Sequence, residues 1–593
     1  MEQTNKFDAD ELAVSIVKGE VTTYRDPVVF ITEKVAFQIK EVIRQVRKNY
    51  WGVFDEPTDK ITGRKKIWVP LTQMIVDNTR KNVDLDTKDI NFFSNLNSGL
   101  RITQLLRAFV RAYLDRTYYG EDMDDVTFSV CVDPVSIMKI YKTKDGIKRR
   151  VIDPLNIFVD PSAKDVQRAY RFTHMDLMTT DEVKAMTGWK NTNRAVADTT
   201  PDTHGVTQLP KTSKYVDVYE TWGLVPKSLF TGNSEDTDEV EAQLVVSGIN
   251  RNEPVVHLIK ENKNKDTEGN VVKPFEDARY MKVPWSFYGI SPAMKVMDIQ
   301  EWVNTIVNLR NNKNTIAQLG LFKIRAGSNI NTQALTRLVS NGVIKVTNMD
   351  DLDNFQIPEA GPGSYRDEET AKMWAAEVTS AYEVVRGQLP STATATAAVI
   401  QDKNSKSAFV IVTDSLGRFN EKVIQRHILP HLPDMMKKQG IIRYFSDMEE
   451  AKVLRERVVA NEAMKYLDES VVVPSEMELS TAMNEAERRL QKNGDLFFSN
   501  LKDIIVDGIE TRVQVTNEKM DTATVARNLQ ELLQVIPQEA QPETAAMIYD
   551  VLGLTPPKAL TSPVSQVPAE NMQVPNQTGE AVAANTLQNV GTV

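Results

Sequence analysis

Two histidines, His427 and His431, are the first residues whose spacing could do chemistry. A helix would place residues four apart on one face, where they could share a metal ion. Pro430 disturbs helical geometry between them, and the chain contains no HExxH motif. We therefore predict a packing or surface role for both histidines, and no metal site.

Other chemical signatures are equally incomplete. Asn262–Asn270 resembles a calcium loop, but Thr267 occupies the position that requires glycine, so a polar hairpin tip is expected. Gly361-Pro-Gly363 lacks the Lys-Ser/Thr of a phosphate loop. The acidic residues Asp122, Asp124 and Asp125 are typical of a solvated turn. We predict no enzymatic activity and no cofactor.

The single cysteine, Cys131, lies in the apolar run Phe128–Val132. A buried small hydrophobic residue is favoured there over a nucleophile. One cysteine excludes an intrachain disulfide framework and is typical of a reducing compartment.

The overall charge limits the kind of nucleic-acid contact that can be expected. The 593 residues carry a formal net charge of -10, with 41% hydrophobic and 26% charged residues. Proteins that grip DNA phosphates normally present a basic surface. If this chain meets DNA, it should meet it loosely, as the wall of a channel does.

No apolar run approaches the roughly 20 residues needed to span a bilayer, and the N-terminus lacks the features of a signal peptide. We expect no membrane association, and synthesis in the cytoplasm. The length predicts several domains or one elongated subunit of several parts.

Helical spacing predominates in residues 1–125, with Pro70 placed where a helix can start. From residue 126 the pattern changes to period two, and Val126, Phe128 and Val130 predict a strand. A hairpin is predicted about the turn Lys144-Asp-Gly146.

Further strands and turns follow this hairpin. A short strand lies between two Asp-Pro turns in 151–161, and Thr179-Thr-Asp-Glu182 predicts a capping box. Residues 188–214 predict a long surface loop. More strands are predicted at 215–222, 243–246 and 254–259.

The middle of the chain predicts helices around a small α/β insertion. A helix from Ser291, its cap, to about Ala317 has an apolar stripe opposed by an Asn-rich face. The insertion combines strands at 320–325 and 342–346 with a helix at 333–339. A helix over Glu368–Arg386 follows, and another that reaches about Ile428.

The C-terminal part begins with charged helices over 449–500. Residues 504–506 and 511–515 predict a strand pair around Asp507-Gly508, followed by helices over 521–552. The composition from Thr555 onward predicts disorder.

This order of parts resembles the portal proteins of tailed bacteriophages. Tyr288-Gly-Ile-Ser-Pro292 is similar to the Gly-x-Ser-Pro motif that starts the stem in many portals. Pro154–Pro161 is similar to a strand and turn of the portal wing. The resemblance spans most of the chain, and the order of its short motifs is more specific than any one of them.

The resemblance implies an α+β, mainly helical fold of the portal type, with wing, stem, clip and crown. Its parts, in order, are a helical part of the wing (1–125), a β-rich wing (126–286), a stem helix (287–318), an α/β clip (319–362), a second stem helix (363–386), a tunnel loop (387–396), a long wing helix (397–440), a helical segment and strands returning to the wing (441–516), a helical crown (517–554) and a disordered tail (555–593).

The resemblance also implies a function. Twelve subunits would form a ring at the unique capsid vertex, the channel for packaging and ejection of double-stranded DNA. Terminase, and then neck or adaptor proteins, would dock on the clip, and the major capsid and scaffold proteins would meet the wing. The protein would be assembled in the host cytoplasm and kept in the virion. Such a head-to-tail ring needs two different complementary faces on each subunit.

Small polar side chains in the tunnel loop, and lysines that follow it, are the candidates for transient contact with DNA. They are Gln388, Ser391, Thr392, Thr394, Thr396, Lys403 and Lys406. A simple capping role for Ser391–Thr396 fits the residues equally well.

Three other classes compete with this interpretation. The strongest alternative is another virion structural protein or an internal ejection protein, which would be more uniformly helical. An enzyme would need a carboxylate or histidine constellation that the sequence lacks. A cytoplasmic scaffold would leave the order of helix, insertion and helix unexplained.

Overall fold

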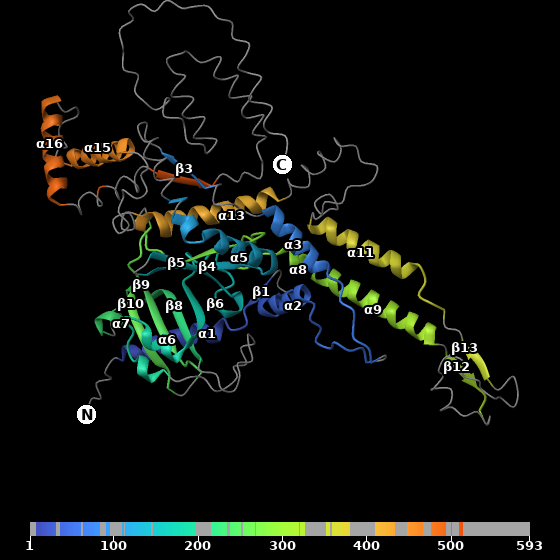
Figure 1. Ribbon diagram of the computed structural model, residues 1–593. Coiled ribbons are helices and arrows are strands. Elements are labelled where there is room, and N and C mark those ends of the chain that lie inside the picture. Colours follow the sequence, from blue (N-terminus) through green and yellow to red (C-terminus); the bar gives the residue numbers. More distant parts are fainter. Residues whose placement is uncertain are drawn as a thin grey trace, which may run out of the picture. The chain divides into compact units, whose positions relative to one another are not determined.

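A computed structural model of the chain divides it into two units, 1–519 and 520–593, and every described residue belongs to the first (Figure 1). The structure describes residues 8–30, 36–60, 63–83, 90–94, 110–111, 113–143, 146–195, 215–233, 236, 238–250, 253–266, 269–319, 321–326, 352–355, 358–379, 409–432, 448–465, 476–493, 500 and 509–513.

An antiparallel five-stranded sheet forms one layer of the fold. Its strand order is β10-β9-β8-β7-β6, and the strands are β6 (Ile157–Val159), β7 (Arg171–Thr179), β8 (Tyr215–Pro226), β9 (Glu239–Ser247) and β10 (Val255–Glu261). Helix α1 (Ala9–Thr23) buries Ala13, Val17 and Val21 against one face of this sheet. The strands predicted at 215–222, 243–246 and 254–259 are confirmed.

A three-stranded antiparallel sheet, β11-β4-β5, faces the other side of the first. Strands β4 (Ser136–Thr143) and β5 (Gly146–Ile152) form the predicted hairpin, and β11 (Phe275–Ala278) pairs with β4. Phe172, Trp222 and Phe275 are buried between the two sheets. Alternate residues of β4, Met138 and Ile140, belong to a second core on the outer face of this sheet.

Helix α5 (Tyr119–Val132) corrects the predicted strand at 126–130. Its apolar residues are buried on several sides, against β4, β5 and α13, so the sequence has no single apolar stripe. A short apolar run enclosed in this way cannot be distinguished from a buried strand by periodicity alone. Cys131 is fully buried, as predicted, and burial raises the pKa of its thiol to about 12.

Two more N-terminal helices confirm the helical prediction for this region where it is described. They are α2 (Ile39–Trp51) and α3 (Leu71–Val83), which begins directly after Pro70. Short strands β1 (Val28–Phe30) and β2 (Ala36–Gln38) pair before α2. The Thr179 capping box is also confirmed, at the start of α6 (Thr180–Ala185).

The predicted helix from Ser291 is present but divided. Ser291 caps α8 (Pro292–Lys295), and after Val296 the chain continues as α9 (Met297–Leu319). Strands β12 (Leu321–Ile324) and β13 (Leu352–Phe355) pair beyond it, and α11 (Gly363–Thr379) packs against α9 (Figure 1). Helix α11 begins at Gly363, five residues before the predicted Glu368, and the Arg366 N–H bonds to the Pro362 carbonyl in its first turn.

The C-terminal part of the described chain contains α13 (Val410–Val423), a π-helical turn η5 (Ile424–Ile428), a 3₁₀ turn η6 (Leu429–His431), and the predicted charged helices α15 (Met448–Met464) and α16 (Glu476–Lys492). Strand β14 (Ile509–Val513) pairs with β3 (Ile90–Ser94). This pairing was not predicted, because the two strands are far apart in the sequence. The 504–506 strand predicted as its partner lies outside the described residues.

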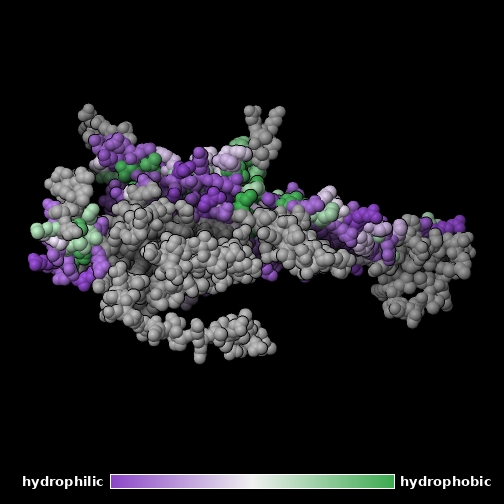
Figure 2. All heavy atoms as spheres, turned by 90° about the horizontal axis from the view of Figure 1, so that it is seen from above, coloured by the Kyte–Doolittle hydropathy of each residue, from purple (hydrophilic) through white to green (hydrophobic). Residues whose placement is uncertain are grey.

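The described surface is largely hydrophilic in the view of Figure 2, with separate apolar patches. No helix in the described part of the chain is long and apolar enough to cross a membrane. The predicted insertion elements at 333–346, the helices at 521–552 and the tail from Thr555 lie outside the described residues. The α+β class is confirmed, and the division into wing, stem, clip and crown stays a prediction.

Candidate functional site

The Tyr288–Pro292 motif joins the sheets to the helix pair α9–α11. Gly289 lies so close to the chain that an added Cβ would be 2.5 Å from the carbonyl oxygen of Met281. The Ser291 hydroxyl accepts the Met294 N–H at 3.2 Å and donates to the Val132 carbonyl at 2.8 Å. Glycine and serine are thus required here for close packing and for capping, which fixes where the helix pair leaves the sheets.

The polar face of α9 has a structural purpose that the sequence did not indicate. Its side-chain amides bind the main chain of residues 67–72, the segment that leads into α3 and its first turn. Gln300 accepts the Thr72 N–H at 2.8 Å. Asn304 accepts the Val69 N–H at 3.0 Å, and Asn308 accepts the Ile67 N–H at 2.7 Å.

Two of these amides also donate back to the same segment. Gln300 donates to the Val69 carbonyl at 2.7 Å, and Asn308 donates to the Ile67 carbonyl at 2.8 Å. Because Gln300 and Thr72 are fully buried, these bonds satisfy backbone groups that water cannot reach. The amide ladder, Gln300, Asn304 and Asn308, therefore fixes α9 to the N-terminal helices.

An ionic cluster joins α9 to α11. Arg310 pairs with Glu368 at 2.6 Å, Lys372 pairs with the same carboxylate at 2.5 Å, and the Arg310 guanidinium lies 4.1 Å from the Tyr365 ring centre. Burial alone would raise the pKa of Glu368, but the two cations outweigh it and lower that pKa. Small residues Ala371 and Ala375 allow the helices to approach closely.

An apolar face of the helix pair is left exposed. Trp302 of α9 stacks on Trp374 of α11, with ring centres 5.7 Å apart, and the two residues are 38% and 47% exposed. Further apolar side chains on the same helices are also exposed, namely Leu309, Met373 and Val378. We call Trp302 and Trp374, which are in contact, the tryptophan face. Grouped exposed apolar residues of this kind are typical of a protein contact surface.

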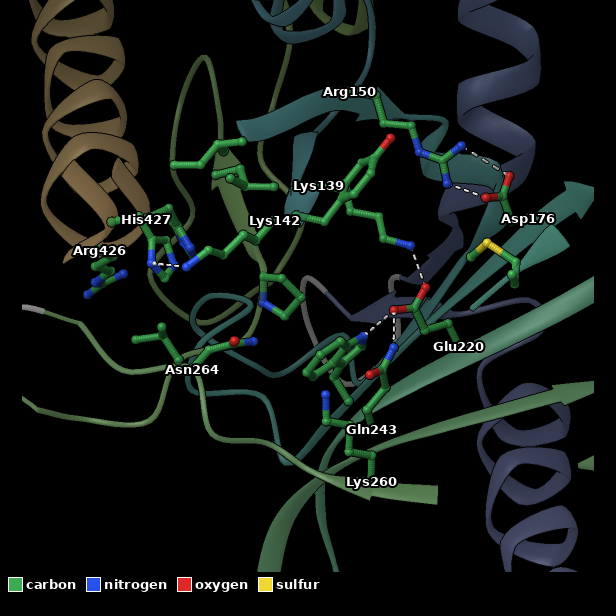
Figure 3. Close-up of a pocket in the computed structure, with 18 of the residues that line it drawn as sticks. Lys139, Lys142, Arg150, Asp176, Glu220, Gln243, Lys260, Asn264, Arg426 and His427 are labelled. Carbon is green, nitrogen blue, oxygen red and sulfur yellow. Dashed lines mark hydrogen bonds and ion pairs between the residues drawn. The ribbon is translucent and has the colours of Figure 1, made fainter. Parts of the chain in front are cut away.

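A cavity of about 620 Å³ opens between the two sheets and η5 (Figure 3). Two ion pairs cross from one sheet to the other: Lys139 of β4 with Glu220 of β8, and Arg150 of β5 with Asp176 of β7. Glu220 also accepts hydrogen bonds from the Trp222 indole (2.7 Å) and the Gln243 amide (2.9 Å).

These contacts control the protonation of Glu220 in the cavity and of the buried His174 near Lys139 and Arg150. Burial alone would raise the pKa of Glu220, but the charge and hydrogen bond of Lys139 outweigh it and lower that pKa, so the carboxylate is ionised at neutral pH. Burial, aided by Lys139 and Arg150, lowers the pKa of His174 well below its usual range. His174 is therefore neutral, and its Nδ1 has no hydrogen-bond partner.

The predicted packing role of the paired histidines agrees with their contacts. His427 of η5 lies 3.2 Å from the buried Glu276 of β11, which also pairs with Arg426 at 3.0 Å. His431 Nδ1 lies 3.4 Å from Lys142 Nζ. In the part of the chain that the structure describes, no three His, Cys, Asp or Glu side chains are grouped as metal ligands.

Asp122 differs from its prediction as part of a solvated turn. It lies in the first turn of α5 and pairs with the buried Arg149 at 2.8 Å. The charged residues of the cavity were missed altogether. The signal available was a charged residue within a strand, such as Asp176 or Glu220, with the next cavity-lining residue two positions on. A single sequence does not distinguish such residues from solvent-facing ones.

The predicted DNA-facing side chains cannot be placed by this structure. Gln388, Ser391, Thr392, Thr394, Thr396, Lys403 and Lys406 all lie outside the described residues. Their role and the order of parts around them stay predictions.

Comparison with known proteins gives one family. Residues 112–379 match the family model described as the phage SU10 portal protein. The matched range includes both sheets, the helix pair and the strand residues that line the cavity, but not Arg426, His427 and His431 on its other wall. None of the curated proteins matches the chain.

Proposed function

We propose, on the premise that residues 112–379 mark the chain as a tailed-phage portal protein, that it forms the ring at the unique capsid vertex through which double-stranded DNA enters and leaves. In this proposal the protein is a structural conduit of about twelve subunits and not an enzyme. It lies in the virion after assembly in the host cytoplasm.

The observation that carries the proposal is the tryptophan face on a helix pair that extends from the sheets. A head-to-tail ring needs an apolar surface that a neighbouring subunit covers. Trp302 and Trp374 provide a rigid aromatic surface of the type enriched in interfaces. The amide ladder and the ionic cluster hold the two helices in place without using this surface.

DNA passage through the ring requires weak contacts. Because the chain has a net charge of -10, it offers DNA phosphates few strongly attractive sites. A packaging motor could therefore move a duplex through the ring. In the proposal, the hydroxyl residues of the tunnel loop and Lys403 and Lys406 make transient contacts only.

Docking partners follow from the proposed division of the subunit. Terminase, and later neck or adaptor proteins, would bind the end of the helix pair that includes β12 and β13. The major capsid and scaffold proteins would bind the two-sheet region.

Negative-stain electron microscopy of the purified chain tests the proposal. We expect rings of near twelve-fold symmetry, with a central hole wide enough for duplex DNA. The double variant Trp302→Ser/Trp374→Ser should remain folded but lose rings, because it removes the aromatic centre of the proposed interface.

Trp51→Ser is the matched control, since Trp51 is 69% exposed on α2 and is not part of the tryptophan face. It should form rings as the unchanged protein does. Two-fold dimers or a compact oligomer without a channel would overturn the portal proposal. Intact rings in the double variant would overturn the assignment of the tryptophan face.

A further inference from the structure

The cavity between the sheets has a charge opposite to that of the whole chain. Six lysine or arginine residues line it, and only two carboxylates do so. The cations are Lys139, Lys142, Arg150, Lys260, Lys265 and Arg426. With Glu276, which pairs with Arg426, three carboxylates oppose six cations, although the chain has a net charge of -10.

These cations form an inner and an outer set. Lys139 and Arg150 lie inside and are neutralised by Glu220 and Asp176. Lys260 and Lys265 lie exposed at the rim, and no carboxylate of the described residues pairs with them. Because the inner charges cancel, the positive potential of the cavity comes from the rim lysines. A concave surface concentrates such a potential.

The cations lie on separate walls and do not converge on one point (Figure 3). Lys142 belongs to β4, Lys260 to β10 and Arg426 to η5. A single phosphate would be contacted by only one wall. An extended ligand with several separated negative charges could contact all of them.

The apolar part of the lining favours a peptide over a nucleotide. Met178 and Met186 are flexible side chains that adapt to different apolar partners. The two indoles are already engaged: Trp189 stacks on His257 with ring centres 5.4 Å apart, and Trp222 donates to Glu220. Neither indole is arranged to receive a base between its ring and another aromatic group.

We propose that this cavity binds an acidic polypeptide segment, whose carboxylates contact the rim lysines and whose apolar side chains contact Met178 and Met186. A volume of about 620 Å³ lies within the usual range for ligand pockets. The proposal goes beyond ring formation and DNA passage and does not rest on either, because the cavity is formed by one chain.

Fluorescence polarisation with the full-length chain tests it. The probe is a fluorescein-labelled peptide of three Glu-Glu-Leu repeats, and the control peptide replaces each glutamate with glutamine. We expect saturable binding of the acidic peptide alone, weakened by added salt. Lys260→Gln/Lys265→Gln should lower its affinity about ten-fold, the combined size expected for two exposed charge contacts.

Lys18→Gln/Lys81→Gln is the matched control, because it removes the same charge from exposed lysines of α1 and α3. Its affinity should stay within about two-fold of the unchanged protein. Met186→Glu, which adds a negative charge to the lining, should weaken binding by a similar factor to the rim variant.

Three results would overturn the proposal. The two double variants could lose affinity equally, which would indicate non-specific attraction. The glutamine peptide could bind as well as the acidic one. Inorganic phosphate or ATP could displace the peptide at lower concentration than unlabelled peptide does, which would assign the cavity to a phosphate ligand. Each result is independent of whether the protein forms rings.

Discussion

The two-sheet region and the helix pair α9–α11 bury their apolar residues differently. In the two-sheet region, aromatic residues such as Phe172 and Phe275 are fully buried, and α1, α5 and α13 cover the outer faces. In the helix pair, the buried apolar residues are aliphatic and of small or moderate size, such as Val303 and Ala375, and the largest aromatic residues, Trp302 and Trp374, are exposed.

This difference indicates which region is complete within one chain. The two-sheet region gains its stability from apolar burial. The helix pair is held by the amide ladder and by Arg310, Glu368 and Lys372, which fix geometry while leaving an apolar surface for another molecule. Mutations should therefore affect stability in one region and assembly in the other.

The largest effect on stability is expected from Phe275→Ala. Phe275 is fully buried, with its ring centre 4.7 Å from that of Phe172, so truncation removes apolar contacts and leaves a cavity. We expect a loss of about 3–5 kcal/mol in the free energy of unfolding, measured by urea denaturation. A loss below about 1 kcal/mol would contradict the view that this core dominates the stability of the two-sheet region.

A smaller effect is expected from the amide ladder. Gln300→Ala leaves the buried Thr72 N–H without a partner and the Val69 carbonyl with the Leu71 N–H alone, and it should cost about 2–3 kcal/mol. Faster hydrogen exchange of residues 67–72 would measure it locally. Asn308→Ala, at the exposed end of the ladder, should cost about 1 kcal/mol or less. Equal effects of the two variants would contradict the importance of burial.

The pH dependence of stability provides a third comparison. Because burial lowers the pKa of His174, the unfolded chain takes up a proton below about pH 6.5 while the folded protein does not. Stability is therefore lost as the pH falls below about 6.5. The expected contribution is about 1.4 kcal/mol between pH 7.5 and 5.5.

His174→Leu should remove this part of the slope and leave stability at pH 7.5 unchanged or higher, because the Nδ1 atom that lacks a partner is removed. Part of the pH dependence of stability should remain in this variant, because burial also lowers the pKa of His257. Thermal unfolding at both pH values measures the difference. An unchanged slope would show that His174 is not the responsible group.

The smallest effect on stability is expected from Trp374→Ser. Because its side chain is almost half exposed, we expect a loss of about 1 kcal/mol or less in the free energy of unfolding of the isolated subunit. Chemical denaturation at low protein concentration measures it. A loss as large as that of Phe275→Ala would show that the tryptophan face belongs to the core of the chain.

The sequence predicted the start of the helix pair but not the cavity between the sheets. The start of the helix pair was predicted, because the Ser291 cap and Pro292 act through local geometry. The cavity was not, because Lys139, Arg150, Asp176 and Glu220 come from four strands. The portal resemblance came from the order of parts and is supported by the match over residues 112–379.

By itself the sequence determined the features that neighbouring residues control: the hairpin at Gly146, the capping box at Thr179, the helix starts at Ser291 and after Pro70, and the burial of Cys131. The tertiary structure alone decided that 126–132 is a helix, that β14 pairs with β3, and that the amides of α9 bind a distant main-chain segment. The physical reason is that caps and turns depend on a few consecutive residues. Burial on all sides and pairing between distant segments depend on which surfaces the folded chain brings together.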